Sequence, residues 1–198
     1  DEKTLEIVTM VYAGLVNKNI VAKLQAEKCN ALGLSGADGN SIKAVKRPVK
    51  DIDYGFVGDI PSDAVNINLL VKLLSEGFVP VFSAITHDGN GQLLNTNADT
   101  IASALAIALS RIYKCSLIYC FEKKGVLENV HDENSVIKEI KSTSFISLQE
   151  QGIISDGMIP KIHNAFEAIR KGVEEVFIGS SHDLALLEEN TFGTRLVK

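Results

Sequence analysis

Two kinds of hydrophobic pattern alternate along the 198 residues of the chain. Between residues 3 and 29, apolar positions recur every three or four residues, which predicts a long amphipathic helix. Residues 78–85 and 115–121 are almost continuously apolar, which is typical of strands buried on both faces of a parallel sheet. Because the two patterns alternate to the end of the chain, we predict an α/β sandwich with a mainly parallel sheet.

The other elements are predicted from the same periodicities and from the capping and turn residues at their ends. Residues 62–77 read as a helix that Ser62 or Asp63 caps and Gly77 ends. A DG turn predicts a hairpin over residues 86–95. Further helices are expected at residues 99–112, 144–153, 158–172 and 183–189. Strands are expected at residues 29–34, 42–49, 173–180 and 193–197. Residues 54–60 are predicted to form a strand or a turn, and the element at residues 135–140 is ambiguous. No repeat or linker interrupts the pattern, so one domain is expected over residues 1–198.

Charge and cysteine content exclude several classes of protein. The net charge is −5, whereas nucleic-acid-binding domains usually present a basic face. Three cysteines without CxxC spacing indicate free thiols in a reducing compartment, and four scattered histidines predict no metal site. The charged first residues do not form a signal peptide, and no apolar run approaches the roughly 18 residues of a membrane span. A cytoplasmic protein without nucleic-acid or membrane partners is therefore expected.

The segment NTNAD, residues 95–99, concentrates polar side chains at the start of an alanine-rich helix. Capping of that helix by Asp99 is one explanation. It leaves Asn95 and Asn97 unexplained, and asparagine amides suit a carboxylate or acyl amide ligand because they both donate and accept hydrogen bonds. The positive end of the helix would also attract an anion.

A second segment, GIISDGMIPK at residues 152–161, places Lys161 about one turn into a predicted helix. A lysine there opposes the helix dipole, and it is better placed if it points at an anion. A solvated surface lysine is the alternative. The glycines of GLSGADG, residues 33–39, could let the backbone approach an anion closely or could simply form a turn. No Walker A loop, GxGxxG fingerprint, GxSxG elbow or HExxH motif is present.

The order of these segments is more specific than any one of them. The chain resembles the N-acetylglutamate kinases of the amino acid kinase family in the order of six segments: ALGLSGADGN, GFVGDI, GFVPVFSAI, GQLLNTNADT, QGIISDGMIPKI and FGTRLV. The opening segment, TLEIVTMVYAGLVNKNIVAKL, resembles a helix of that family. The resemblance covers essentially the whole chain. It implies a three-layer α/β sandwich and phosphorylation of the γ-carboxylate of an N-acylated glutamate by MgATP, with the Mg²⁺ carried by the nucleotide, in arginine biosynthesis. It also implies a homodimer.

The resemblance also implies roles for individual residues. Asn95 would bind the α-carboxylate or acyl amide of the substrate, Lys161 would neutralise charge on the phosphoryl group in transfer, and Asp99 would hold active-site lysines in place. The residue types suit this chemistry, because a carboxylate nucleophile is already ionised at pH 7 and needs no general base. The nucleotide site would include Glu122, Lys123, Lys124, Gly125, Val126, Leu127, Ile153, Ile154 and Ser155.

Two departures from the family pattern leave alternatives open. The chain starts after the family's lysine-glycine-glycine strand, glycine-rich loop and substrate-binding arginine, so it is expected to represent an N-terminally truncated domain. In the nucleotide segment FEKKGVL, Phe121 and Glu122 stand where the family usually has a small hydroxyl residue and an aspartate. A non-catalytic amino-acid-binding protein on the same fold, or a sister kinase with another substrate, is the alternative. The acyl group on the substrate, acetyl or succinyl, is left open.

Overall fold

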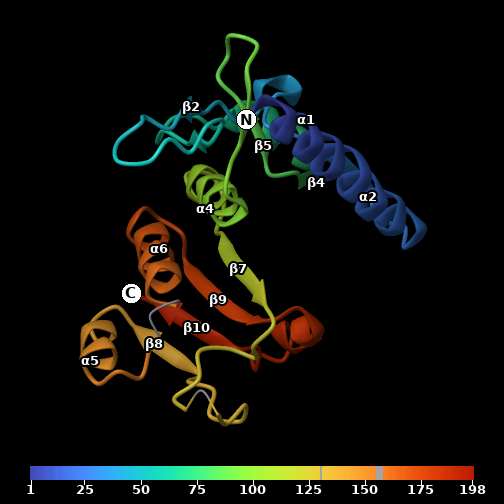
Figure 1. Cartoon of the computed structure of the whole chain (residues 1–198). Coiled ribbons are helices and arrows are strands. Elements are labelled where there is room, and N and C mark those ends of the chain that lie inside the picture. The colour runs from blue at the N-terminus through green and yellow to red at the C-terminus, as the bar shows by residue number, and fades with distance from the viewer. Residues whose placement is uncertain (130, 155–157) are drawn as a thin grey trace. The chain divides into compact units, whose positions relative to one another are not determined.

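The computed structural model describes residues 1–129, 131–154 and 158–198. The chain folds into two compact units, Asp1–Ala108 and Leu109–Lys198 (Figure 1). The first unit comprises α1 (Glu2–Thr9), η1 (Met10–Val16), α2 (Asn17–Ala26), β1 (Ala31–Leu34), η2 (Asp38–Asn40), β2 (Val45–Lys46), β3 (Gly58–Asp59), α3 (Ile67–Ser75), β4 (Val79–Phe82), β5 (Ile85–His87), β6 (Leu93–Asn95) and α4 (Ala98–Leu109). The second comprises β7 (Ser116–Phe121), β8 (Glu139–Lys141), α5 (Phe145–Glu150), α6 (Ile159–Arg170), β9 (Glu175–Ser180), η3 (Ser181–Leu187) and β10 (Thr194–Val197).

The predicted first helix is confirmed as one continuous helix made of α1, a π-helical turn η1 and α2. The buried side chain of Asn17 donates to the carbonyl of Val81 at 2.8 Å, and the Lys18 ammonium donates to the carbonyl of Gly33 at 3.2 Å. By length and composition alone this 25-residue helix could cross a membrane. The hydrogen bonds of Asn17 and Lys18, however, attach the helix to β4 and β1. Length and composition are therefore not sufficient to identify it as a membrane segment.

The strands of the first unit form small sheets. β1 pairs in parallel with β4, β2 pairs antiparallel with β3, and β5 and β6 form the predicted hairpin with Ile85 opposite Asn95. The single strand predicted over 78–85 is wrong, because the chain leaves β1 after Phe82 and begins the hairpin at Ile85. The strand predicted over 42–49 is likewise reduced to the two residues of β2.

The cap of α3 also differs from the prediction. Asn66, rather than Ser62 or Asp63, caps the helix, because its side-chain oxygen accepts from the N–H of Leu69 at 3.1 Å. The N–H of Asn66 itself donates to the carbonyl of Ser41 at 2.9 Å. This long-range contact fixes the point at which the helix can begin, and local sequence gives no sign of it.

The second unit is built on a four-stranded sheet in the order β7-β9-β10-β8. β7 with β9 and β10 with β8 are parallel pairs, and β10 runs antiparallel to β9. Helix α6 packs against β9 and β10, and the core between them is fully buried (Figure 1). Its apolar side chains include Ile140, Ile162, Val176, Ile178 and Leu196. The predicted α/β class with a mainly parallel sheet is confirmed, and the ambiguous segment 135–140 contributes β8.

Candidate active site

The polar cluster of the first unit lies where β6 leads into α4. Asn97 caps this helix, because its side-chain oxygen accepts from the N–H of Thr100 at 3.1 Å. The capping role considered for Asp99 is therefore carried by Asn97, and the partly buried Asp99 lies in the first turn of α4. A backbone hydrogen bond fixes the position of Asn95, whose N–H donates to the carbonyl of Phe56 at 2.8 Å.

A buried serine that the sequence did not single out lies beside this cluster. Ser83 is 7% exposed, and its hydroxyl has no hydrogen-bond partner among the described residues. The N–H of Ser83 donates to the carbonyl of Leu34, and the carbonyl of the next residue, Ala84, accepts from the N–H of Thr96 at 3.0 Å. Ser83 therefore lies between the end of β1 and the segment that enters α4. An unpaired buried hydroxyl is costly, which suits a ligand that accepts its hydrogen bond.

The glycine-rich loop after β1 is closed by its own side chains. The carboxylate of Asp38 accepts from the N–H and the hydroxyl of Ser35, at 2.6 and 2.7 Å. A Cβ at Gly36 would lie 2.6 Å from the carbonyl oxygen of Ile42. Local packing therefore explains this glycine, and the predicted approach of an anion to the loop stays a prediction.

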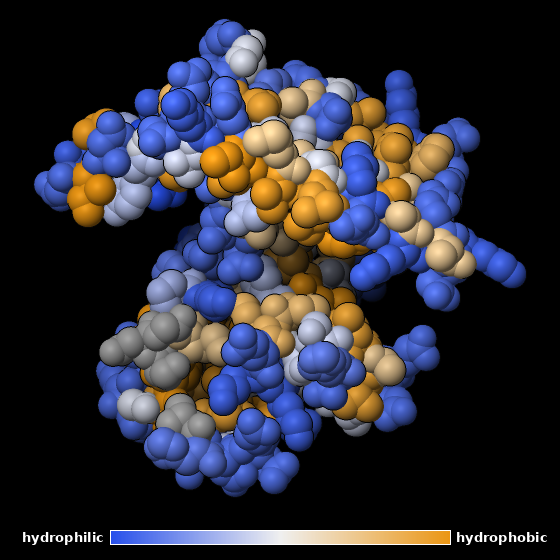
Figure 2. Space-filling view, turned by 45° about the vertical axis from the view of Figure 1, so that its right-hand side comes forward, coloured by the Kyte–Doolittle hydropathy of each residue, from blue (hydrophilic) through white to orange (hydrophobic). Residues whose placement is uncertain are grey.

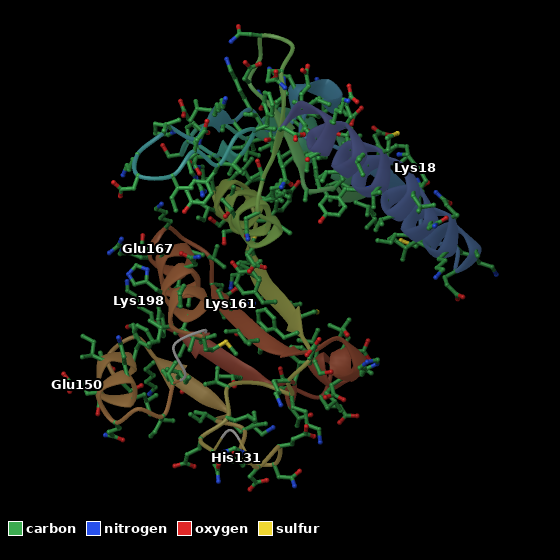
Figure 3. All side chains as sticks on the ribbon, in the orientation of Figure 1. Lys18, His131, Glu150, Lys161, Glu167 and Lys198 are labelled. Atoms are coloured by element: carbon green, nitrogen blue, oxygen red, sulfur yellow. The ribbon has the colours of Figure 1, made fainter. Side chains whose placement is uncertain are left out.

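In the second unit, the end of β7 and the start of α6 line a pocket of about 590 Å³. Lys161, the third residue of α6, lies in this pocket (Figure 3). Its Nζ lies 3.6 Å from the centroid of the Phe121 ring. The other lining residues are Cys120, Glu122, Lys123, Met158 and Ser181. An ammonium at the positive end of a helix, inside a concave surface, can bind an anion such as a phosphate.

The predicted nucleotide residues take up different positions in this unit. Glu122 and Lys123 line the pocket together with Lys161, and Lys124 is exposed. Val126 and Leu127 are buried, and the N–H of Val126 donates to the hydroxyl of Thr194 at 2.8 Å.

A Cβ at Gly125 would lie 2.8 Å from that same Thr194 hydroxyl, so packing requires glycine there. The N–H of Ile153 donates to the carbonyl of Leu148, and Ile154 is buried. Ser155 lies outside the described residues. The structure thus gives packing roles to several residues of this set, and their nucleotide contacts stay a prediction.

Acidic, histidine and cysteine side chains are the usual protein ligands of metal ions. Among the described residues, no group of three or more His, Cys, Asp or Glu side chains gathers to hold a metal ion. The three cysteines are free thiols, and partial burial raises the pKa of Cys115, which keeps that thiol protonated.

Comparison with known proteins places this arrangement in a family. The model of the amino acid kinase family matches residues 1–180, and the chain belongs to that family. It is 55% identical over 198 residues to the acetylglutamate kinase of Bacteroides thetaiotaomicron, which covers 100% of this chain and 75% of that protein. It is 40% identical over 182 residues to the acetylglutamate kinase of Methanopyrus kandleri, covering 90% of this chain and 72% of that protein.

Solved structures agree with this fold. The crystal structure of smu.665 from Streptococcus mutans UA159 is 28% identical with a TM-score of 0.78, covering 100% of this chain and 73% of that one. The N-acetylglutamate synthase of Neisseria gonorrhoeae is 22% identical with a TM-score of 0.83, covering 100% of this chain and 44% of that one. At that identity the likeness to the synthase shows the fold alone.

Proposed function

We propose that the protein phosphorylates the γ-carboxylate of N-acetyl-L-glutamate with ATP, forming an acyl phosphate in arginine biosynthesis. The observation that carries the proposal is identity of 54–55% to acetylglutamate kinases across the whole chain. Lys161 in the pocket of the second unit supports it, because phosphoryl transfer to a carboxylate depends mainly on positioning and charge neutralisation.

We assign the predicted roles as follows. Lys161 neutralises charge on the transferred phosphoryl group, Asn95 binds the α-carboxylate or acyl amide of the substrate, and Asp99 orients active-site lysines. The hydroxyl of Ser83, which has no partner among the described residues, is suited to donate to the same substrate. The predicted residues of segments 122–127 and 153–155 contact ATP. The Mg²⁺ would be carried by the nucleotide, because this ion commonly binds through substrate phosphates.

The two alternatives are less well supported. A non-catalytic amino-acid-binding protein would have no chemical need for Lys161, and a sister kinase would not be expected to match acetylglutamate kinases over its full length. The same family relationship supports a cytoplasmic biosynthetic enzyme, which we retain as a proposal.

The test is ATP-dependent acyl phosphate formation by the full-length protein, trapped as a hydroxamate, with N-acetyl- and N-succinyl-L-glutamate in parallel. We expect product with N-acetylglutamate. If product forms only with N-succinylglutamate, the acyl group of the natural substrate is succinyl and not acetyl. If the protein is folded and binds ATP but forms neither product, the kinase assignment is wrong. Glutamate without an acyl group serves as the matched control substrate.

We also propose that the protein is a homodimer and that the long helix takes part in the contact. Ile7, Met10 and Leu15 are 57%, 64% and 63% exposed on this helix, and Figure 2 shows hydrophobic side chains at the surface of this unit. Such exposed apolar rows commonly mark interfaces. The double substitution Met10→Glu and Leu15→Glu is expected to convert a dimer into monomers in sedimentation velocity, whereas Lys23→Glu on the same helix is not. A monomeric wild-type protein would contradict this.

A further inference from the structure

The ring of Phe121, the last residue of β7, lies against the ammonium of Lys161. The Nζ of Lys161 lies 3.6 Å from the centroid of the ring, well inside the roughly 6 Å range of cation–π attraction. Both residues line the same pocket.

The ring is itself held in place. Phe121 pairs with Ser180 at the end of the parallel β7–β9 ladder. On the same face of β7, the buried Tyr119 lies with its ring centroid 6.3 Å from that of Phe121. A strand position and an aromatic neighbour therefore restrict the ring before any ligand binds.

We propose that Phe121 is a positioning residue, whose ring face holds the Lys161 ammonium in the pocket where it meets the phosphates of the nucleotide. This inference rests on the proposed function. A free lysine side chain has roughly 2 kcal/mol of rotamer entropy to lose when it binds an anion. The ring restricts the ammonium beforehand. A ring attracts a cation through its quadrupole without neutralising it, so the contact with Phe121 does not itself weaken the attraction between Lys161 and the phosphate.

The proposal predicts a direct spectroscopic signature. After reductive ¹³C-methylation of the lysines, which preserves their charge, the methyl resonance of Lys161 is expected to shift upfield because it lies over the ring face. Lys161→Arg removes and so assigns this resonance. The shift is expected to disappear in Phe121→Leu, which keeps much of the volume without the ring, and to persist in Phe121→Tyr. An unshifted resonance in the wild-type protein would overturn the proposal.

Kinetics supply the second readout. In the full-length enzyme, Phe121→Leu is expected to lower kcat by about three- to thirty-fold, the range of cation–π energies, with little change in the KM for N-acetylglutamate. Phe121→Tyr should stay within about two-fold of wild type. Phe177→Leu, which removes a ring from β9 in the same sheet, is the control for loss of aromatic packing.

The outcomes separate this proposal from the proposed function. If Phe121→Leu and Phe121→Tyr lower kcat equally, or if neither lowers it, Phe121 does not position Lys161. If the wild-type enzyme forms no acyl phosphate but the ring-dependent shift is present, the contact stands and the kinase assignment fails.

Discussion

Substitution of Lys161 by alanine is expected to lower kcat for acyl phosphate formation by about 100- to 1000-fold, the usual cost of removing one charge-stabilising group from a transition state. The KM for N-acetylglutamate should change little, because the lysine is assigned to the phosphoryl group and not to the amino acid. Stability should be almost unaffected, because Lys161 is partly exposed on the first turn of α6. Steady-state kinetics of the full-length protein measure both constants.

The matched control for this prediction is Lys171→Ala at the other end of the same helix. Lys171 is exposed and lies outside the pocket, so its removal tests the general effect of losing a positive charge from α6. We expect it to keep wild-type turnover. If Lys161→Ala retains activity within a few-fold of wild type, Lys161 is an ordinary surface lysine and its catalytic role is wrong.

Substitution of Gly193 by alanine is expected to lower the free energy of unfolding by about 3 kcal/mol or more. Gly193 precedes β10 with a φ of +47°, in the left-handed region that alanine disfavours. An added Cβ would also lie 2.1 Å from the carbonyl oxygen of Ile178 and 2.9 Å from the Cα of Gly179. Both obstacles are backbone atoms of β9, so relief requires the two strands to separate. Denaturant unfolding followed by circular dichroism measures the loss.

Gly152→Ala separates conformational strain from the steric clash. Gly152 has a φ of +68°, but no atom of the residues that the structure describes lies within 4 Å of the position of an added Cβ. Its substitution should cost about 1 kcal/mol, from the left-handed backbone alone. Equal losses at the two positions would show that the close contact between Gly193 and β9 carries no additional energy.

The sequence predicted elements best where a pattern was local. The 3.6-residue period of the first helix, the DG turn of the β5–β6 hairpin and the apolar run of β7 all correspond to observed elements. Prediction failed where a distant partner decides the outcome. Asn66 caps α3 because its backbone is hydrogen-bonded to Ser41. The apolar run 78–85 forms parts of two strands, because β4 pairs with β1 whereas β5 pairs with β6.

The same distinction applies to the candidate site. Lys161 could be identified from its position in a helix, because the helix dipole makes a lysine there unusual. Ser83 could not, since a serine in an apolar strand is ordinary, and only the structure leaves its hydroxyl without a partner among the described residues. The sequence marked Phe121 only as a departure in the nucleotide segment, and its contact with the Lys161 ammonium appears only in the structure.

The position of β10 in its sheet has a consequence for the synthesis of the protein. This strand follows β8 and β9 in the sequence, yet it lies between them in the sheet and is the strand that joins them. The ribosome therefore releases β8 and β9 before the strand that joins them. Until residues 194–197 emerge, the edge of β9 and the whole of β8 expose unpaired backbone groups to other nascent chains. Chaperone binding during translation should accordingly persist until residues 194–197 have emerged.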